Sequence, residues 1–252
     1  MRAIPRCGLI VLSMVLTIGL IIPVGALAAK EIKIGVIYPL TGGAAAAGRE
    51  LRAGVELAVE IANNAMADIN MTMAKAAGIT SMGGAKIEII FKDHEGNPTL
   101  GADLAKKLIL DDKVDGLLGC YHSSVTKTVS AVAEQYGVPM INGSSTSPAL
   151  TKRGFKWFWR TTPHDVWFTK DLFEMLNGLT EGKVKGVQAV PKKDIMNLSS
   201  ACEKTEWGSF VSELIQQFAK EYGYDLRKCM LYAKEAPDLS SEVRSLKASR
   251  AD

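Results

Sequence analysis

Residues 114–148 read VDGLLGCYHSSVTKTVSAVAEQYGVPMINGSSTSP. The apolar run at 114–119 predicts a strand, and the apolar spacing through 124–136 predicts a helix. A second strand is predicted at 138–142, leading into a polar loop at 143–148. A strand, a helix and another strand in this order are typical of a parallel sheet covered by helices. We therefore expect an α/β protein.

The same alternation extends outward from this unit in both directions. Further strands are predicted at 31–38, 86–92, 156–160, 184–190 and 228–233, and further helices at 51–62, 98–109, 165–177, 207–222 and 239–249. Residues 65–84 have no clean periodicity and are expected to form an excursion. The pattern predicts two lobes, each a parallel sheet flanked by helices. The second series stops before enough strands exist to close its sheet, so we expect an incomplete second lobe or a shortened sequence.

The first 29 residues have the composition of a secretory signal peptide. A basic start containing Arg2 and Arg6 precedes an apolar segment, and small residues near Ala28 suit cleavage. A membrane anchor is the alternative. Removing residues 1–29 lowers the formal charge from +3 to +1. A nearly neutral chain gives no electrostatic reason to expect nucleic acid as a partner.

Three cysteines lie beyond the signal peptide: Cys120, Cys202 and Cys229. In an oxidising compartment, an odd number leaves at least one of them unpaired within the chain. Cys202 and Cys229 fall in the same late segment and are the expected bridge. The alternative is three separate buried thiols, because a free cysteine packs as a small apolar residue.

Three loops follow predicted strands at the sheet edge where open parallel sheets bind ligands. The loops are 41–48, which is rich in Gly and Ala, 121–124, which reads Tyr-His-Ser-Ser, and 143–148, which carries four hydroxyl side chains. Hydroxyls and the free N–H groups at a helix start suit a carboxylate or an amide. The alternative for the Ser and Thr residues is ordinary helix capping. Two hydroxyl-rich loops after neighbouring strands favour binding.

Motifs of catalysis and metal binding are missing from the sequence. Gly43 and Gly48 have phosphate-loop spacing, but Arg49-Glu50 replaces the required Lys and Ser/Thr. There is no Gly-x-Ser-x-Gly nucleophile motif. His94, His122 and His164 lack metal-ligand spacing and are interpreted as polar loop residues. We therefore expect no enzyme activity, no cofactor and no metal.

The four tryptophans have different expected roles. Trp157 and Trp159 lie on one face of a short strand and are expected in the core. Trp167 and Phe168 begin a helix and are expected in the core, with the wall of a crevice as the alternative. Trp207, at the head of a helix in the second series, is expected to close over a ligand held by the first lobe.

The chain resembles the periplasmic branched-chain amino-acid-binding proteins, which are solute receptors of ABC transporters, across residues 30–252. The order and spacing of several short motifs carry the resemblance: Ile34-Gly35-Val36, Pro39-Leu40-Thr41-Gly42, Arg52-Ala53-Gly54, Gly96-Asn97-Pro98, Ser123-Ser124, Tyr136-Gly137-Val138-Pro139, residues 144–151, Arg160-Thr161-Thr162-Pro163 and Asp238-Leu239-Ser240. The resemblance implies the two-lobed type I periplasmic-binding fold, with a first lobe at 30–162 and the crossover and partial second lobe at 163–252.

By the same resemblance, Ser123, Ser144 and Thr146 grip the ligand carboxylate and part of its amine. Trp207 occupies the place of a ligand-covering Tyr, Ala47 replaces another Tyr, and Tyr121 and His122 fill that space or reach the ligand. The acidic partner of a ligand ammonium belongs to sequence beyond Asp252.

The implied function is capture of an amino acid, of the branched-chain type, by lobe closure in the periplasm. The expected partners are the ligand and the membrane permease subunits of the transporter, and the receptor is expected to be a monomer. Alternatives are a receptor for short amides, urea or aromatic acids, and the ligand-sensing domain of a signalling receptor.

Overall fold

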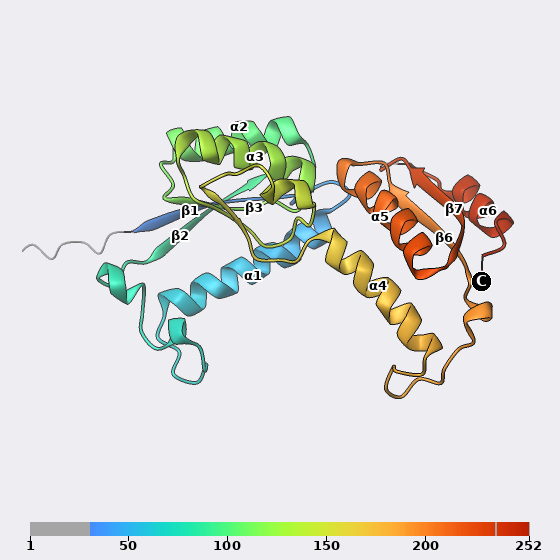
Figure 1. Ribbon diagram of the computed structural model, residues 1–252. Coiled ribbons are helices and arrows are strands. Elements are labelled where there is room, and N and C mark those ends of the chain that lie inside the picture. Colours follow the sequence, from blue (N-terminus) through green and yellow to red (C-terminus); the bar gives the residue numbers. More distant parts are fainter. Residues whose placement is uncertain (1–30, 235, 252) are drawn as a thin grey trace, which may run out of the picture.

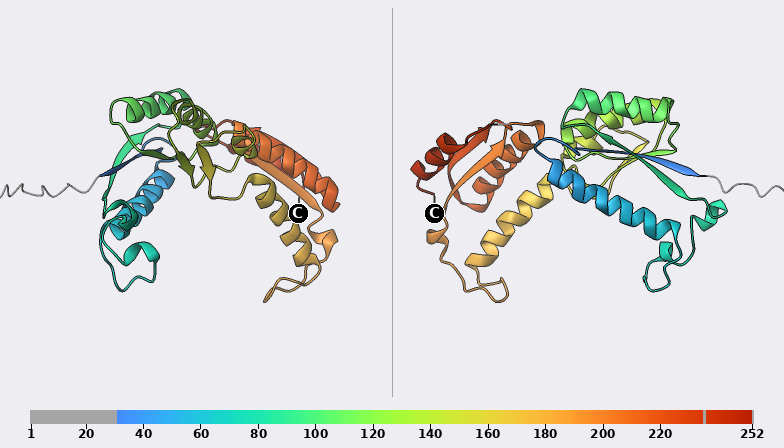
Figure 2. Two further views of the ribbon diagram at one scale, coloured as in Figure 1. Left: turned by 60° about the vertical axis from the view of Figure 1, so that its left-hand side comes forward. Right: turned by 180° about the vertical axis from the view of Figure 1, so that it is seen from behind.

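The computed structural model describes residues 31–234 and 236–251, so the predicted signal peptide lies outside the described residues. Two lobes follow one another along the chain and meet at one side (Figure 1). The helices α1 and α4 start near this junction and diverge from it (Figure 1, Figure 2). In the part of the chain that is described, no helix is both long and apolar enough to cross a bilayer.

The first lobe is built on a parallel sheet of five strands in the order β2-β1-β3-β4-β5. Its strands are β1 (Ile32–Tyr38), β2 (Ile87–Asp93), β3 (Gly116–Gly119), β4 (Met140–Asn142) and β5 (Phe158–Arg160), and its helices are α1 (Ala45–Asn63), α2 (Pro98–Leu110) and α3 (Ser123–Tyr136). The short 3-10 helices η1 (Thr72–Ala74) and η2 (Thr80–Met82) lie in the predicted excursion, and η3 (Pro148–Thr151) follows β4.

Local sequence explains where these helices start and stop. Asn97 caps α2 by accepting the N–H groups of Thr99 and Leu100, and Pro98 occupies the first turn, where its missing N–H costs nothing. Helix α3 ends at Gly137, whose φ of 67° is the left-handed conformation that glycine adopts freely. These residues set the start of α2 and the end of α3.

The core of the first lobe lies between the sheet and the pair α2 and α3. Ile37, Leu108, Val125, Val129 and Met140 are fully buried there. Helix α1 runs along the opposite face of the sheet (Figure 1). An apolar hollow of about 660 Å³ lies between this helix and the sheet, and Ile34 and Leu118 line it on the sheet side. That face of the sheet is therefore covered less completely.

The second lobe contains α4 (Asp165–Thr180), η4 (Lys192–Asp194), β6 (Asn197–Glu203), α5 (Glu206–Tyr222), β7 (Asp225–Tyr232) and α6 (Ser240–Ala248). Its two strands are parallel, and α5 packs on them around Phe173, Leu214 and Phe218.

The strand predicted at 184–190 is wrong. Residues 184–190 form an irregular, largely exposed segment in which Gly186 has a φ of 79°. The first strand of this lobe, β6, begins thirteen residues after the predicted start. The apolar spacing of 184–190 resembles a strand, whereas Ser199 and Ser200 make the true strand look polar.

The expected bridge between Cys202 and Cys229 is also wrong, because all three described cysteines are free thiols. Cys229 lies opposite Ser200 in the strand register, and Cys202 lies opposite Leu231. The Cys229 sulfur instead contacts the Ser200 and Ser212 hydroxyls at 3.0 and 2.9 Å.

Two expectations about tryptophans are wrong as well. Trp157 and Trp159 are 41% and 48% exposed, and Trp167 is 54% exposed, so none of them lies in a core. The strand β5 stands at the edge of the sheet, where Phe158 is buried and the neighbouring Trp157 and Trp159 are exposed.

Candidate functional site

A cavity of about 580 Å³ lies between the lobes, at the carboxyl ends of the strands of both sheets. The first lobe lines it with Gly43, Ala44, Ala46, Ala47, Tyr121, His122, Ser123, Ser124, Ser144 and Thr146, and the second lobe with Glu203, Thr205, Trp207, Tyr232 and Lys234. All six residues selected from the sequence, Tyr121, His122, Ser123, Ser144, Thr146 and Trp207, are therefore brought together. Their contacts with a ligand stay predictions.

The start of α3 faces this cavity. His122 precedes the helix in an extended conformation and its side chain caps no backbone N–H group. The N–H groups of the first turn have no partner within the helix, and the helix dipole places positive potential there. Ser123 is buried and Ser124 is half-buried beside these groups. The combination suits a carboxylate.

A buried network joins the ends of β3 and β4 beneath the cavity. The Asn142 amide donates to the carbonyls of Gly119 and Cys120 at 2.9 and 3.1 Å. The hydroxyls of Ser145 and Thr126 lie 2.6 Å apart, and both residues are buried. Nothing in the sequence distinguishes Ser145 from the neighbouring hydroxyl residues, but its contacts in the structure hold the two loops together.

Ser144 and Thr146 alternate with Ser145 and face the cavity instead. The Ser144 hydroxyl donates to the Cys120 carbonyl at 2.7 Å. Thr146 Oγ1 accepts the indole N–H of Trp207 at 3.0 Å, and its own hydroxyl hydrogen stays available to a ligand.

Trp207 connects the two lobes at the cavity wall. Its Nε1–H group is shared between Thr146 and the Oδ1 atom of Asp165, 2.9 Å away. Asp165 is only 4% exposed, and its other oxygen has no hydrogen-bond partner among the described residues. Sequence reasoning did not select Asp165, which begins α4 at the crossover between the lobes.

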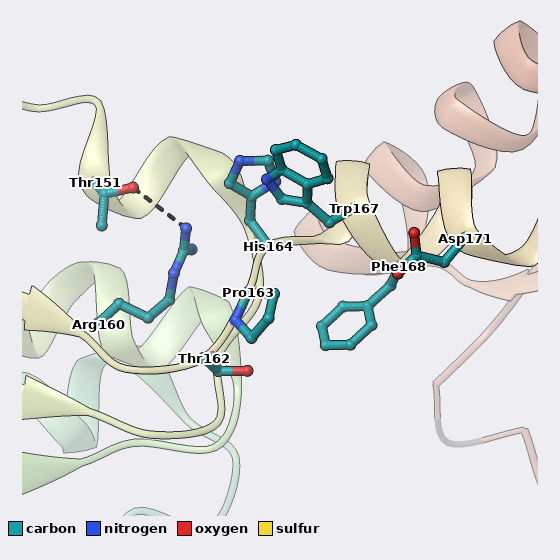
Figure 3. Close-up of a pocket in the computed structure, with 8 residues that line it drawn as sticks. All are labelled: Thr151, Arg160, Thr162, Pro163, His164, Trp167, Phe168 and Asp171. Carbon is teal, nitrogen blue, oxygen red and sulfur yellow. Dashed lines mark hydrogen bonds between the residues drawn. The ribbon is translucent and has the colours of Figure 1, made fainter.

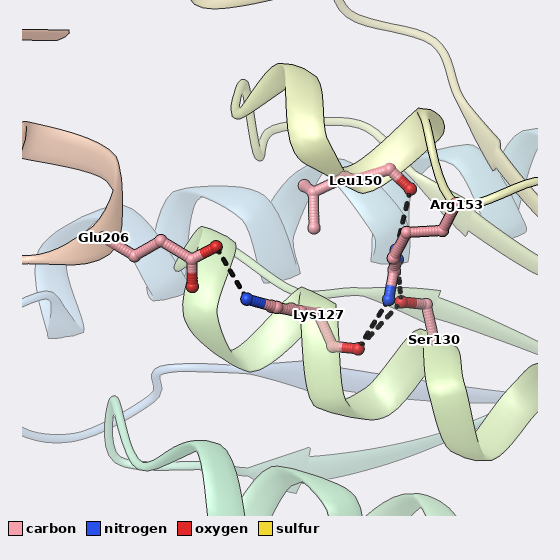
Figure 4. A network of polar contacts seen from close by, with 5 residues as sticks. All are labelled: Lys127, Ser130, Leu150, Arg153 and Glu206. Atoms are coloured by element: carbon pink, nitrogen blue, oxygen red, sulfur yellow. Dashed lines mark hydrogen bonds and ion pairs between the residues drawn. The ribbon is translucent and has the colours of Figure 1, made fainter. Parts of the chain in front are cut away.

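A second connection between the lobes lies on the outer side of α3. The Lys127 ammonium is 3.1 Å from Glu206 at the start of α5 (Figure 4). Arg153 braces the same part of α3, donating to the carbonyls of Lys127 and Leu150 and to the Ser130 hydroxyl. Burial lowers the pKa of Arg153, and the neighbouring carboxylates of Glu206 and Glu134 oppose that effect. These contacts hold the head of α5 against the first lobe.

Two histidines lie behind the start of α3, and one of them is not the polar loop residue expected. His94 is fully buried, with its ring 5.4 Å from that of His122. Burial lowers the pKa of each to about 4, and the charge of Lys234 adds to the effect for both. Both imidazoles are therefore neutral at physiological pH.

A backbone contact sets the tautomer of His94. His94 Nδ1 accepts the Gly96 N–H at 2.9 Å, which places the proton of the neutral ring on Nε2. No group of three or more His, Cys, Asp or Glu side chains with metal-binding geometry occurs in residues 31–234 and 236–251.

The second-lobe wall was missed by the sequence reasoning. Glu203 ends β6, and Lys234 and Tyr232 lie at the end of β7, so the rule that places ligands at the carboxyl ends of strands applies here too. Because the first strand of this lobe was predicted at 184–190, its true end at Glu203 went unrecognised.

A separate hollow of about 530 Å³ lies beside the crossover, between η3 and α4 (Figure 3). On one side, Arg160 points toward Thr151 and donates to Ser147 and Thr151, and on the other, Trp167 and Phe168 project from the start of α4 (Figure 3). It shares no residue with the cavity between the lobes.

Comparison with known proteins gives a consistent result. A family model described as "Periplasmic binding protein" matches residues 31–252. The Leu/Ile/Val-binding protein homolog 7 of Brucella suis is 28% identical over 238 residues, which cover 94% of this chain and 54% of the relative. The chain thus spans about half the length of the curated relatives it matches.

Solved structures show the same fold at low sequence identity. A leucine-binding protein, LivK, from Thermotoga maritima aligns with a TM-score of 0.68 at 20% identity, covering 87% of this chain and 54% of that one. A solute-binding protein of an ABC transporter from Rhodopseudomonas palustris, in complex with 3,4-dihydroxybenzoic acid, aligns with a TM-score of 0.70 at 19% identity, covering 88% and 53%.

Proposed function

Because the chain belongs to the periplasmic binding protein family, a family of solute-binding receptors, we propose that it captures a small carboxylate-bearing solute for an ABC importer. Its fold is the two-lobed type I α/β fold of this family, as the sequence predicted. The ligand proposed first is a branched-chain amino acid, in line with the curated relatives called Leu/Ile/Val-binding protein homologs.

The observation that carries this proposal is the cavity lined by both lobes. Ser123 and the start of α3 supply donors for a carboxylate, and Thr146 supplies a further hydroxyl. The Ser144 hydroxyl donates to the Cys120 carbonyl, so its oxygen is left to accept a hydrogen bond from the ligand. Trp207, Tyr121 and His122 form the walls around the rest of the ligand. Recognition by hydrogen bonds in a cleft between domains is typical of small-molecule sites.

The proposed mechanism is capture by lobe closure. The chain passes between the lobes after β5 ends at Arg160 and before α4 begins at Asp165, which supports a division into lobes at 30–162 and 163–252. Rotation about these few crossover residues brings Trp207 over a ligand held by the first lobe. The proposed signal peptide at 1–29 directs export of the protein. The closed, ligand-bound form then docks on the permease subunits.

Aromatic acids are the second ligand class that an observation favours. Tyr121, Tyr232 and Trp207 all line the cavity, and one structural relative was solved with 3,4-dihydroxybenzoic acid. Aromatic side chains provide stacking surface for a planar ring.

A thermal-shift screen against amino acids, aromatic acids, short amides and urea tests the function. A ligand present at about 100 times its Kd adds about 2.7 kcal/mol to the free energy of unfolding and raises Tm. We expect a shift with leucine-like amino acids that is lost in Ser144→Ala and Thr146→Ala. Ser241→Ala, on the exposed surface of α6, serves as the control and should leave the shift intact.

The other outcomes are equally specific. A shift with aromatic acids or amides alone would keep the receptor function and replace the ligand. No shift across the panel would contradict uptake of these solutes and favour a sensory role.

A further inference from the structure

All formal charge in the cavity lining comes from the second lobe. The ten first-lobe lining residues are Gly, Ala, Ser, Thr, Tyr and a His that is neutral at physiological pH, whereas the second lobe contributes Lys234 and Glu203. Neither of these two charged groups takes part in an ion pair with any residue in the described part of the chain, nor do they pair with each other. A cavity that holds one unpaired cation and one unpaired anion is complementary to a ligand that carries both signs.

The Lys234 ammonium stands beside the start of α3. It lies 2.8 Å from the point that a Cβ atom on Gly96 would occupy, and the His122 ring lies 3.5 Å from the same point. Gly96 therefore leaves the space that the lysine fills. Lys234 adds a full positive charge to the partial charge of the helix end, and both attract the same carboxylate.

Glu203 faces the cavity from the last position of β6. It pairs in register with Tyr232, another lining residue, so its side chain is held by the sheet and not by a free loop. The side chain is half-buried and has no cation within 4 Å among the described residues. A half-buried carboxylate without a cation beside it is stabilised when a ligand supplies an ammonium group.

We propose that Lys234 and Glu203 select for zwitterionic ligands, with Lys234 and the start of α3 holding the carboxylate and Glu203 holding the ammonium. The proposal rests on the receptor function proposed above and names its specificity residues. A ligand with both charges then connects the hydroxyls of the first lobe to the charges of the second, so charge recognition and lobe closure become one event.

Titration calorimetry with three related compounds tests the assignment. Leucine carries both charges, 4-methylpentanoate lacks the ammonium, and 3-methylbutan-1-amine lacks the carboxylate. We expect the wild-type protein to bind leucine most tightly. Glu203→Gln should lower the affinity for leucine about tenfold or more and leave the affinity for 4-methylpentanoate unchanged. Lys234→Met should lower the affinity for both compounds that carry a carboxylate.

Control variants separate this effect from a general loss of charge. Lys204→Met and Glu213→Gln change exposed residues outside the cavity and should leave all three affinities unchanged. Thermal melting without ligand should show that Glu203→Gln and Lys234→Met fold like the wild type.

Two results would overturn the specificity assignment while leaving the receptor function in place. One is a wild-type protein that binds 4-methylpentanoate as tightly as leucine, and the other is an unchanged order of the three affinities in both cavity variants. Absence of binding by these compounds and by the whole ligand panel would overturn the proposed function together with the assignment.

Discussion

His94 occupies a position where the folded protein disfavours a charge. It is fully buried, burial lowers its pKa from 6.5 to about 4, and the neighbouring His122 and Lys234 act in the same direction. A backbone hydrogen bond and the charge of Asp93, the preceding residue, favour the protonated form but do not outweigh these effects. The unfolded chain therefore binds a proton at higher pH than the folded chain does.

The stability of the protein should consequently fall in a defined pH range. The contribution of neutral His94 is complete above pH 6.5 and is lost as the pH falls toward 4, at about 1.4 kcal/mol for each pH unit crossed. In His94→Asn, an amide oxygen replaces Nδ1 as acceptor of the Gly96 N–H, and we expect a shallower fall. Urea unfolding at pH 7.5, 6 and 5 measures the difference. Equal slopes for the variant and the wild type would contradict the assignment.

At the scale of the element, helix α1 is positioned by its first turn. A Cβ atom on Gly48 would overlap the Pro39 carbonyl oxygen at the end of β1, whereas a Cβ atom on Gly54 would meet nothing within 4 Å. The close approach of the helix to the strand end therefore requires glycine at position 48, whereas the exposed position 54 can hold a larger residue. This close approach brings Ala46 and Ala47 to the cavity between the lobes.

Two alanine substitutions on this one helix should act in opposite directions. We expect Gly48→Ala to lower the free energy of unfolding by about 1–3 kcal/mol, because the helix must shift away from β1. Gly54→Ala should raise it by about 0.5–1 kcal/mol through helix propensity alone. Chemical denaturation of both variants measures the changes. Equal effects would show that the contact with Pro39 does not position α1.

The elements of the first lobe were predictable because the apolar segments of the sequence are the segments that are buried, and because capping residues mark the helix ends. Its apolar strands lie under helices, and Asn97, Pro98 and Gly137 mark the ends of the helices. In the second lobe the apolar pattern of the sequence does not match the burial of the segments. Strand β6 is half-buried and contains Ser199 and Ser200, while the more apolar segment 184–190 lies on the surface.

The site shows the same division between what was predictable and what was not. The hydroxyl-rich loops were found because they follow correctly placed strands. Glu203 and Lys234 were not found, because position at the end of a strand has no meaning until the strand itself is placed. Asp165 and His94 were missed because burial of a single polar side chain depends on tertiary packing.

At the scale of the whole molecule, the lobes differ in how well they are supported. The first lobe has a sheet of five strands, in which β1, β3 and β4 each have a neighbour on both sides, and a core between the sheet and two helices. The second lobe has two strands among the described residues, and its smaller core centres on Phe173, Leu214 and Phe218. The polar contacts between the lobes centre on the head of α5, at Glu206 and Trp207.

This difference predicts two opening events in the free protein. Amide hydrogens of β7 should exchange at a lower opening free energy than those of β1, because few contacts couple the second lobe to the first. A ligand bound to both lobes should slow exchange in β7 most, since opening of the second lobe then requires release of the ligand. Leu214→Ala, in the core of the second lobe, should speed exchange in β7 and leave β1 unchanged. Hydrogen-exchange mass spectrometry measures all three effects, and equal protection of β1 and β7 in the free protein would show that the lobes unfold as one cooperative unit.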